Sequence, residues 1–214
     1  MRKPKSLPFK SKSTFAIVVD GECEVWYFQM LKRNERLLTV NIEPRIPHRK
    51  KLSEQYKSVL NFANDYTKVF WIIDFDVILS ETKKCKKGDK SALQEFLEYK
   101  KVISKNHDNI VVIINNPCLE FWLLLHFEKK SKPFNNCSSV ENRLKTHLKD
   151  YEKTRNYYTK QNHDIYLKLK SKLNDALSNS KTINTFNSSN PEQSICEMHL
   201  LFETSELKQI LKKH

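Results

Sequence analysis

The stretch "TFAIVVDGECEVWYF", residues 14–28, changes from strand-like to helix-like patterning at its acidic centre. It opens with a run of apolar and β-branched residues, which is typical of a buried strand. After the centre, apolar residues recur at helical spacing through Val25 and Phe28. The centre itself carries Gly21 and three acids, Asp20, Glu22 and Glu24. The stretch therefore predicts a strand that passes through an acidic turn into a helix.

The same alternation continues through the first half of the chain. Strand-like runs cover residues 37–46, 68–74 and 109–115, and helical patterns cover residues 53–66 and 90–106. Strands separated by helices form βαβ units, in which each helix returns the chain to the same edge of the sheet. We therefore predict an α/β fold with a mostly parallel four-stranded sheet and helices on both faces.

The second half of the chain has helical patterns only, joined by polar connections. These patterns cover residues 117–130, 138–153, 163–180 and 191–213. We expect one domain over residues 1–214, with an α/β core over residues 14–116 and a helical elaboration over residues 117–214. Two apolar stripes, residues 165–173 and 200–211, either close the domain's own core or provide a docking face or a dimer interface.

The chain is basic, with 38 Lys+Arg against 25 Asp+Glu and a formal net charge of +13. Such a charge attracts polyanions, of which nucleic acid is the commonest soluble example. A lysine-rich genome that makes every surface basic is the alternative explanation. The chain has only two glycines, so it contains no glycine-rich phosphate loop, and P-loop ATPases and most dinucleotide-dependent oxidoreductases are excluded.

The five cysteines are scattered, odd in number and free of CxxC pairs. This spacing fits neither a structural zinc site nor a disulfide framework, so we expect reduced thiols in the cytoplasm. The basic N-terminus lacks the apolar core of a secretory signal. No apolar run approaches the roughly 18 residues of a membrane span. The sequence predicts a soluble cytoplasmic protein with no membrane partner.

Acidic residues follow two of the predicted strands, at the edge where parallel α/β sheets bind ligands. The first group is Asp20, Glu22 and Glu24, and the second is Asp74 and Asp76. In an extended segment, the spacing of the second pair turns both carboxylates to one side. Neighbouring like charges need compensation, and Mg²⁺, or Mn²⁺ in its place, supplies it. The alternatives are an ordinary turn at Asp20 and favourable charges at a helix N-terminus.

A third polar group interrupts the apolar stretch "NNPCLEFWLLLHF", residues 115–127. Glu120 lies there in a predicted helix that is apolar almost all round. A buried carboxylate is costly unless it is paired or bound to metal, so a functional role and an ion pair with Lys or Arg are both open. Asn115 and Asn116 follow the fourth strand and share its edge with the acids. For His126 we expect burial with a backbone partner rather than a functional role.

These segments, in this order, resemble the RloB-like family. The family's opening "EGE-x-x-E-x-x-Y" is similar to "DGECEVWYF", and its strand-borne "D-x-D" is similar to "IIDFDVI". Its most distinctive stretch, "NPCFE-x-WLLLHF", is nearly reproduced as "NNPCLEFWLLLHF", and its C-terminal "NP…H.L…L" resembles "NPEQSICEMHLLFETSEL". The resemblance spans most of residues 14–207. Family members have a Toprim-type α/β core and occur among prokaryotic abortive-infection and restriction-associated proteins.

The resemblance implies Mg²⁺-dependent action on phosphodiesters, as in topoisomerases, primases and overcoming-lysogeny nucleases. The Toprim glutamate falls on Asp20, and the two aspartates of the D-x-D fall on Asp74 and Asp76. Asp20 is one methylene shorter than a glutamate, and a misplacement of about 1 Å costs up to ~100-fold in rate. Either Glu22 or Glu24 takes over the role, the backbone adjusts, or catalysis is weakened.

The expected site has an acidic part and a basic part. The metal ligands are Asp20, Asp74 and Asp76, and the catalytic set adds Glu24 and Glu120. The residues expected to hold a DNA or tRNA backbone by charge are Arg49, Lys50, Lys51, Lys86 and Lys87. The alternative is that these basic residues lie in solvated loops and contact no nucleic acid. The rival functions are a nucleic-acid-binding module that does not cut and a subunit that docks on a partner ATPase of a defence locus.

Overall fold

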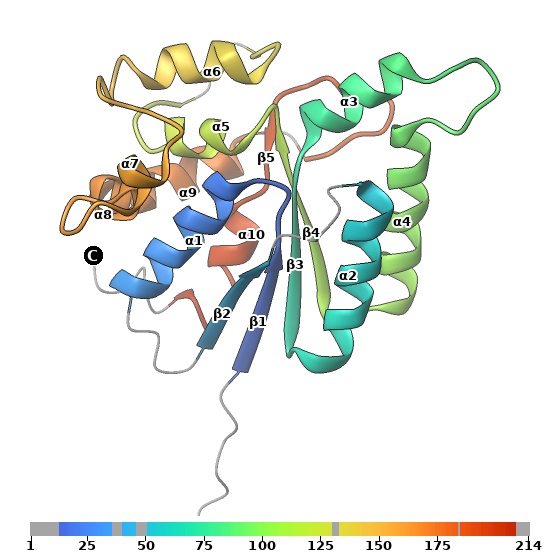
Figure 1. The fold of residues 1–214 in the computed structure, drawn as a ribbon, viewed down its shortest axis with the longest axis horizontal. Helices are drawn as coiled ribbons and strands as arrows, with labels where there is room; N and C mark the ends of the chain where they lie inside the picture. The colour runs from blue at the N-terminus through green and yellow to red at the C-terminus, as the bar shows by residue number, and fades with distance from the viewer. Residues whose placement is uncertain (1–12, 36–39, 46–50, 130–132, 184, 209–214) are drawn as a thin grey trace, which may run out of the picture.

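Parallel strands of almost purely apolar sequence form the centre of the fold (Figure 1). The structure, a computed structural model, describes residues 13–35, 40–45, 51–129, 133–183 and 185–208. The strands are β1 (Ser13–Val18), β2 (Val40–Arg45), β3 (Lys68–Asp74), β4 (Ile110–Asn116) and β5 (Ile195–Cys196), in the spatial order β2-β1-β3-β4-β5. The first four run parallel to one another, and β5 is antiparallel to β4. The predicted α/β fold with a mostly parallel sheet is therefore confirmed.

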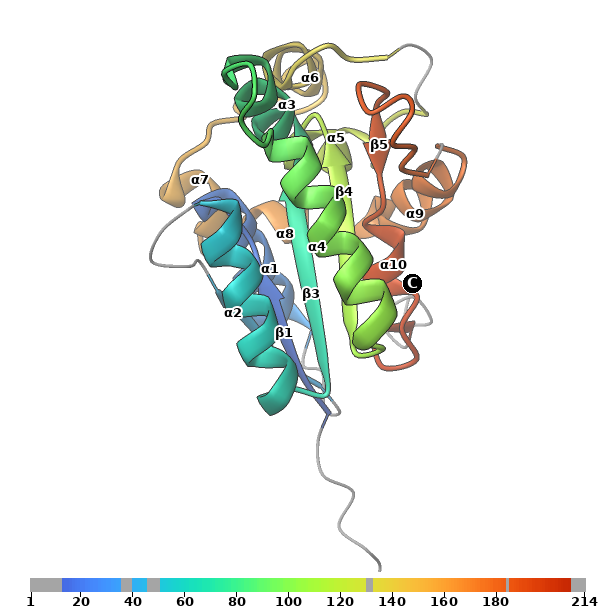
Figure 2. The same ribbon diagram turned by 90° about the vertical axis from the view of Figure 1, so that its right-hand side faces the viewer.

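Helices cover both faces of this sheet, as predicted (Figure 2). One face carries α2 (Leu52–Asp65), α3 (Phe75–Lys84) and α4 (Ala92–Asn106). The other face carries α1 (Glu22–Asn34) and the helices of the second half, which are α5 (Leu119–Leu124), α6 (Cys137–Leu144), α7 (Arg155–Thr159), α8 (Ile165–Leu169), α9 (Leu173–Lys181) and α10 (His199–Phe202). A short 3₁₀ helix, η1 (Lys170–Lys172), joins α8 to α9.

The period-two alternation of the strands divides the interior into two cores. In β1, Phe15 and Ile17 face α1 and the second-half helices, whereas Ala16 and Val18 face α2, α3 and α4. All four side chains are completely buried, because a strand between two helical layers has no solvent-facing side. The second half of the chain thus supplies most of the cover for one face of the sheet.

The apolar stripe at residues 165–173 belongs to this interior. Its side chains Ile165, Leu169 and Leu173 are buried in the same core as Phe15. From the second stripe, Leu201 and Leu207 are buried there as well. These described residues close the protein's own core, which is the commoner use of such a stripe.

The fifth strand corrects the prediction of four strands. Residues 191–213 were expected to form one helix, but Ile195 and Cys196 pair with Asn116 and Asn115 of β4. A strand of two residues gives no periodic signal, and a short apolar run cannot be distinguished from a helical segment by pattern. It forms here because β4 would otherwise present an unpaired edge. The chain becomes helical only after it, in α10.

The predicted helices of the second half are also shorter than expected. The helix expected over residues 117–130 ends as α5 at Leu124, and the one expected over residues 163–180 is divided into α8, η1 and α9. In the first half, α3 follows β3 without any intervening loop and was not predicted. Apolar content identified these segments as buried, but the ends depend on tertiary contacts that periodicity does not contain.

A disulfide between Cys118 and Cys137 corrects the expectation that no disulfide would form. The two cysteines are 19 residues apart in sequence, and the turn from α5 to α6 brings them together. Scattered spacing gave no sign of this contact because it is made in three dimensions. Cys23, Cys85 and Cys196 are free. Among the described residues, none of the helices combines the length and the apolar character needed to cross a bilayer.

Candidate metal centre

The carboxyl ends of β1, β3 and β4 lie side by side at one edge of the sheet (Figure 1). Asp74 is the last residue of β3 and is in register with Asn115 of β4. Asp20 lies between the end of β1 and the start of α1. Because adjacent parallel strands end at the same edge, these side chains are brought together although they are far apart in sequence.

Glu24 joins this group from the first turn of α1. The carboxylates of Asp20, Glu24 and Asp74 each offer an oxygen, and these oxygens lie within 4.8 Å of one another. Glu24 is only 4% exposed, whereas Glu22 is exposed to solvent. Of the two glutamates that follow Asp20, Glu24 is therefore the one at the site.

Gly21 allows Glu24 to reach this position. It is the N-cap residue of α1, and the Glu24 carboxylate folds back against it. A Cβ atom at Gly21 would lie far inside van der Waals contact with Oε2 of Glu24. The glycine in "DGE" is thus needed for the close approach of a carboxylate rather than for an unusual backbone conformation.

If the acidic group binds Mn²⁺, we expect Gly21→Ala to lower the affinity by about tenfold or more, because a residue that positions a metal ligand typically contributes roughly 10- to 100-fold. The added methyl group clashes with the Glu24 carboxylate, which must move from its present position. The measurement is a Mn²⁺ titration followed by calorimetry, with Glu22→Ala as the control because Glu22 is exposed. Equal affinity of Gly21→Ala and the wild type would show that Glu24 does not hold the metal.

Asp76 occupies a different position from the one expected. The sequence prediction placed Asp74 and Asp76 on one extended segment, but the chain turns into α3 directly after Asp74, and Asp76 lies in the first turn of that helix. Its backbone N–H donates to the carbonyl of Pro117 at 3.3 Å. Asp76 is half-buried and lies outside the group formed by Asp20, Glu24 and Asp74. The prediction of an extended D-x-D is therefore wrong.

The three grouped carboxylates repel one another in a poorly solvated place. Burial raises the pKa of Asp74 well above its ordinary value, and the carboxylates of Glu24 and Asp20 raise it further. Burial, followed by the charge of Asp20, raises the pKa of Glu24 from 4.5 to about 8. Oδ1 of Asp74 is enclosed and has no hydrogen-bond partner among the described residues. Such a group is relieved either by holding protons or by binding a cation.

Glu120 has the ion pair that was one of its two expected roles. Its side chain is buried, and its Oε1 lies 3.0 Å from Nζ of Lys153. The hydroxyl of Tyr151 donates to the same oxygen at 2.7 Å. Lys153 was missed in the sequence because nothing distinguishes it from the other members of a total of 38 Lys+Arg. It places a positive charge beside an otherwise acidic site.

Asn115, which the sequence placed at this edge without a role, has an unusual side-chain environment. It is completely buried beside Asp74, and both Oδ1 and Nδ2 lack hydrogen-bond partners among the described residues. An unmet buried polar group costs about 1–3 kcal/mol, so buried amides are nearly always paired. The sequence predicted the position of Asn115 on the fourth strand. It could not predict that the amide lacks partners, because this depends on how the surrounding side chains pack.

A family model described as RloB-like protein matches residues 15–204. The chain belongs to the RloB-like family. The match includes every acidic residue of the site and extends through β5. No curated protein and no solved structure matches the chain.

The basic residues expected at the site of this RloB-like chain are only partly described. Lys51 is exposed at the N-cap of α2, and Lys86 and Lys87 are exposed between α3 and α4. That connection lies at the same end of the sheet as the acids (Figure 1). Arg49 and Lys50 lie outside the described residues. Exposure is compatible with both expected roles, a solvated loop and a backbone contact.

Two other side chains of reactive type are Cys23, which is half-buried beside Glu24, and the more distant His126, which is buried. Burial, followed by the charge of Glu24, raises the pKa of the Cys23 thiol to about 12, so the thiol stays neutral and is a poor nucleophile. His126 is buried with Nδ1 3.0 Å from the carbonyl oxygen of Trp122, and burial lowers its pKa to about 4. The expectation of a buried histidine with a backbone partner is confirmed.

Proposed function

We propose that this RloB-like protein is a Mg²⁺-dependent phosphodiester hydrolase that cuts DNA or RNA, with a Toprim-like arrangement of strands and acids. The observation that carries the proposal is the close group formed by Asp20, Glu24 and Asp74, whose oxygens lie within 4.8 Å of one another. Partly to fully buried carboxylates at one edge of the sheet, in a chain of net charge +13, suit a reaction at the phosphate of a polyanion.

The ligand atoms of this group fit Mg²⁺ or Mn²⁺. Carboxylate oxygens suit these hard cations, whereas zinc sites are built mainly from cysteine and histidine. A second group, Cys118, Glu120 and Cys137, also holds ligand-type atoms within 4.8 Å, but its sulfurs are bonded to each other and are not thiolates. Asp20, Glu24 and Asp74 would therefore hold the cation, with the amide of Asn115 beside them.

The chemistry divides among the side chains around the group. When bound, the cation lowers the pKa of water and stabilises charge on the phosphoryl oxygens. Asp76, expected as a ligand, is assigned instead to take the proton from the attacking water. Burial raises its pKa, which brings this carboxylate towards the range that suits a general base. Lys153, held by Glu120 and 40% exposed, balances the negative charge of the phosphate.

Exposed lysines would hold the polynucleotide without reading its sequence. Lys51, Lys86 and Lys87, together with Arg49 and Lys50, supply charge for backbone contacts, which weaken as salt is added. We place the activity in a prokaryotic abortive-infection system, on the family resemblance. Because the chain has no phosphate-binding loop, any ATP-dependent step there would come from a partner ATPase.

The direct test is a cleavage assay on tRNA, single-stranded DNA and plasmid DNA, with Mg²⁺, Mn²⁺ or EDTA. We expect products with either metal, none with EDTA, and none from an Asp74→Ala/Asp76→Ala double variant. Asp65→Asn is the matched control, because Asp65 is an exposed carboxylate at the end of α2, and it should cut like the wild type.

Cleavage by the double variant would contradict the proposed site. Salt-sensitive binding without any product, unaffected by EDTA, would identify a nucleic-acid-binding module instead of a hydrolase. A complex with a co-encoded ATPase, seen as an increase in solution mass and accompanied by no cleavage, would identify a docking subunit. The three functions are thus separated by one set of samples.

A further inference from the structure

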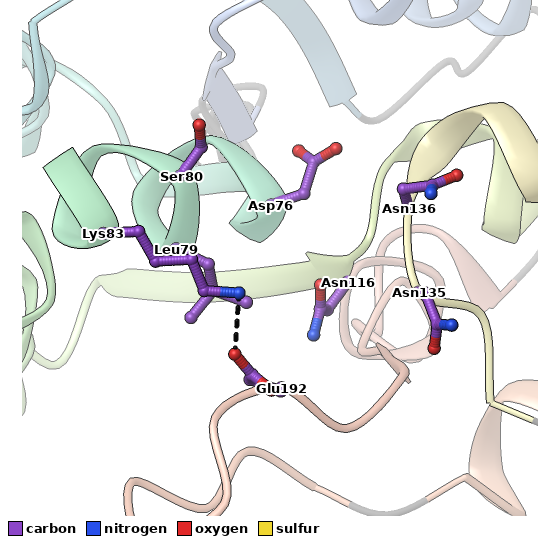
Figure 3. A pocket seen from close by; sticks show the side chains of 8 residues that line it. All are labelled: Asp76, Leu79, Ser80, Lys83, Asn116, Asn135, Asn136 and Glu192. Atoms are coloured by element: carbon purple, nitrogen blue, oxygen red, sulfur yellow. Dashed lines mark ion pairs between the residues drawn. The ribbon is translucent and has the colours of Figure 1, made fainter.

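A polar cavity of about 500 Å³ is lined in part by Asp76, which follows Asp74 of the metal centre by two residues (Figure 3). Its volume lies within the roughly 300–1,000 Å³ of typical small-ligand sites. It is formed where α3, the end of β4, the segment before α6 and the segment before β5 meet. The polar residues that line it include Asp76, Ser80, Lys83, Asn116, Asn135 and Glu192.

The cavity is close to the metal centre, because the charges of Asp76 and Asp74 interact. Asp76 lines the cavity, and it follows Asp74 by only two residues. The hydrogen bond from the Asp76 N–H to the carbonyl of Pro117 fixes the start of α3 against the end of β4. A polynucleotide whose phosphate lies on the acidic group therefore has an adjacent nucleotide within reach of the cavity.

The charge of the lining excludes a phosphate from the cavity itself. Asp76 and Glu192 contribute carboxylates, and the ammonium of Lys83 is already paired with Glu192 at 2.9 Å. This ion pair joins two exposed side chains (Figure 3), so it is weak and opens readily. A neutral group with many hydrogen-bonding atoms suits such a lining better than an anion.

Asparagine amides line the cavity and offer hydrogen-bonding atoms. Asn116 is buried, and its Nδ2 donates to the carbonyls of Pro191 and Gln193 at 3.3 and 2.7 Å. Its orientation is therefore fixed, with the amide oxygen on the side of Asp76 (Figure 3). Asn135 adds an exposed amide. Asparagine amides and carboxylates are the side chains that pair with the edges of adenine and cytosine.

We propose that this cavity binds an unpaired nucleobase of the substrate strand beside the scissile phosphate, so that the protein acts on single-stranded or locally unpaired nucleic acid. The inference rests on the proposed hydrolase function and names the substrate class of that same site. A paired base has its edge engaged with its complement and would have to leave the stack to enter.

The test measures binding separately from cleavage, with Ca²⁺ in place of Mg²⁺. The probes are a fluorescein-labelled single-stranded oligonucleotide, the same strand annealed to its complement, and the same strand with one base removed. Ser80→Trp fills the cavity from an exposed position of α3, and Asn135→Ala removes one amide. The control is Ser178→Trp, because Ser178 is exposed on α9 and does not line the cavity.

We expect the wild type and Ser178→Trp to prefer the single strand over the duplex. Ser80→Trp should lower single-strand affinity by roughly tenfold and leave duplex affinity unchanged, and Asn135→Ala should act in the same direction but less strongly. Loss of one base should weaken binding by the wild type and have no further effect in Ser80→Trp. Thermal unfolding of each variant shows whether it is folded.

Equal effects of Ser80→Trp on single strand and duplex, or no effect on either, would overturn the inference. Cleavage of the same probes with Mg²⁺ keeps this result apart from the proposed function. A protein that binds unpaired bases through the cavity without cutting supports the inference and contradicts the hydrolase. A protein that cuts single strand and duplex alike, with Ser80→Trp equally active, supports the hydrolase and overturns the inference.

Discussion

Asp74→Asn is expected to stabilise the metal-free protein and to abolish Mg²⁺-dependent cleavage. Oδ1 of Asp74 is enclosed and lacks a partner among the described residues, and the carboxylate lies within 4.8 Å of oxygens of Asp20 and Glu24. Near pH 8 the folded protein must either keep the Asp74 carboxylate charged beside Asp20 and Glu24 or keep it protonated. Either form costs free energy of folding, because the same group is ionised and fully hydrated in the unfolded chain. The amide removes that electrostatic cost, which is about 1.4 kcal/mol for each unit by which a pKa is raised.

The same substitution removes a ligand of the proposed cation. Loss of an outer partner of a metal ligand costs roughly 10- to 100-fold, so loss of a ligand itself should cost at least 100-fold in activity. Urea unfolding in EDTA near pH 8 measures the stability, and cleavage with Mg²⁺ measures the activity, with Asp65→Asn as the control. Lower stability of Asp74→Asn in EDTA would show that the Asp74 carboxylate is well accommodated without a cation, contrary to our account.

The stability of the metal-free wild type should fall as pH rises from about 6.5 to about 8. The folded-state pKa of Glu24, raised mainly by burial to about 8, lies above its ordinary value of 4.5, so the folded protein holds a proton that the unfolded chain has released. The contribution is complete below the unfolded value and is lost as pH rises through the folded value. Over this window one such proton is worth about 2 kcal/mol. Asp74 acts in the same direction.

Below this pH window, a histidine makes the stability of the protein change with pH in the opposite direction. Burial lowers the pKa of His126 to about 4, so the folded state excludes a proton that the unfolded chain binds below about pH 6.5, and this makes stability rise with pH there. Mg²⁺ should restore the stability lost near pH 8, by about 2.7 kcal/mol at a hundredfold excess over its Kd. It should stabilise less near pH 6.5, where protons compete for the same carboxylates.

Chemical unfolding at several pH values, with EDTA or Mg²⁺, provides this measurement. Asp74→Asn should show a shallower pH dependence and little response to Mg²⁺. Stabilisation by Mg²⁺ that is equal at both ends of the pH window, or equal in Asp74→Asn, would mean that the ion binds elsewhere.

The sheet and the edge on which the acids gather were predictable because both follow from local pattern. Buried parallel strands are continuously apolar, and their carboxyl ends must share an edge, which is why Asp20 and Asp74 could be placed together from the sequence. β5 could not be predicted, because two residues carry no period and its formation depends on the open edge of β4.

The details of the site depend on contacts that the sequence does not contain. The sequence left Glu22 and Glu24 equivalent. In the structure the Glu24 carboxylate lies buried against Gly21, whereas Glu22 is exposed to solvent. Lys153 reaches Glu120 across the turns between α5 and α7, and the Cys118–Cys137 disulfide closes the same region. Asp76 was misplaced because helix α3 starts at the residue before it, where an extended segment was assumed.

The measurement that tests the central claim most directly is calorimetric Mn²⁺ binding near pH 8 to the wild type, Asp65→Asn and Asp74→Asn. Our account predicts that the wild type and Asp65→Asn bind the ion equally and that Asp74→Asn loses the binding while remaining folded. Absence of binding in the wild type, or equal binding in Asp74→Asn, would contradict a metal centre formed by Asp20, Glu24 and Asp74.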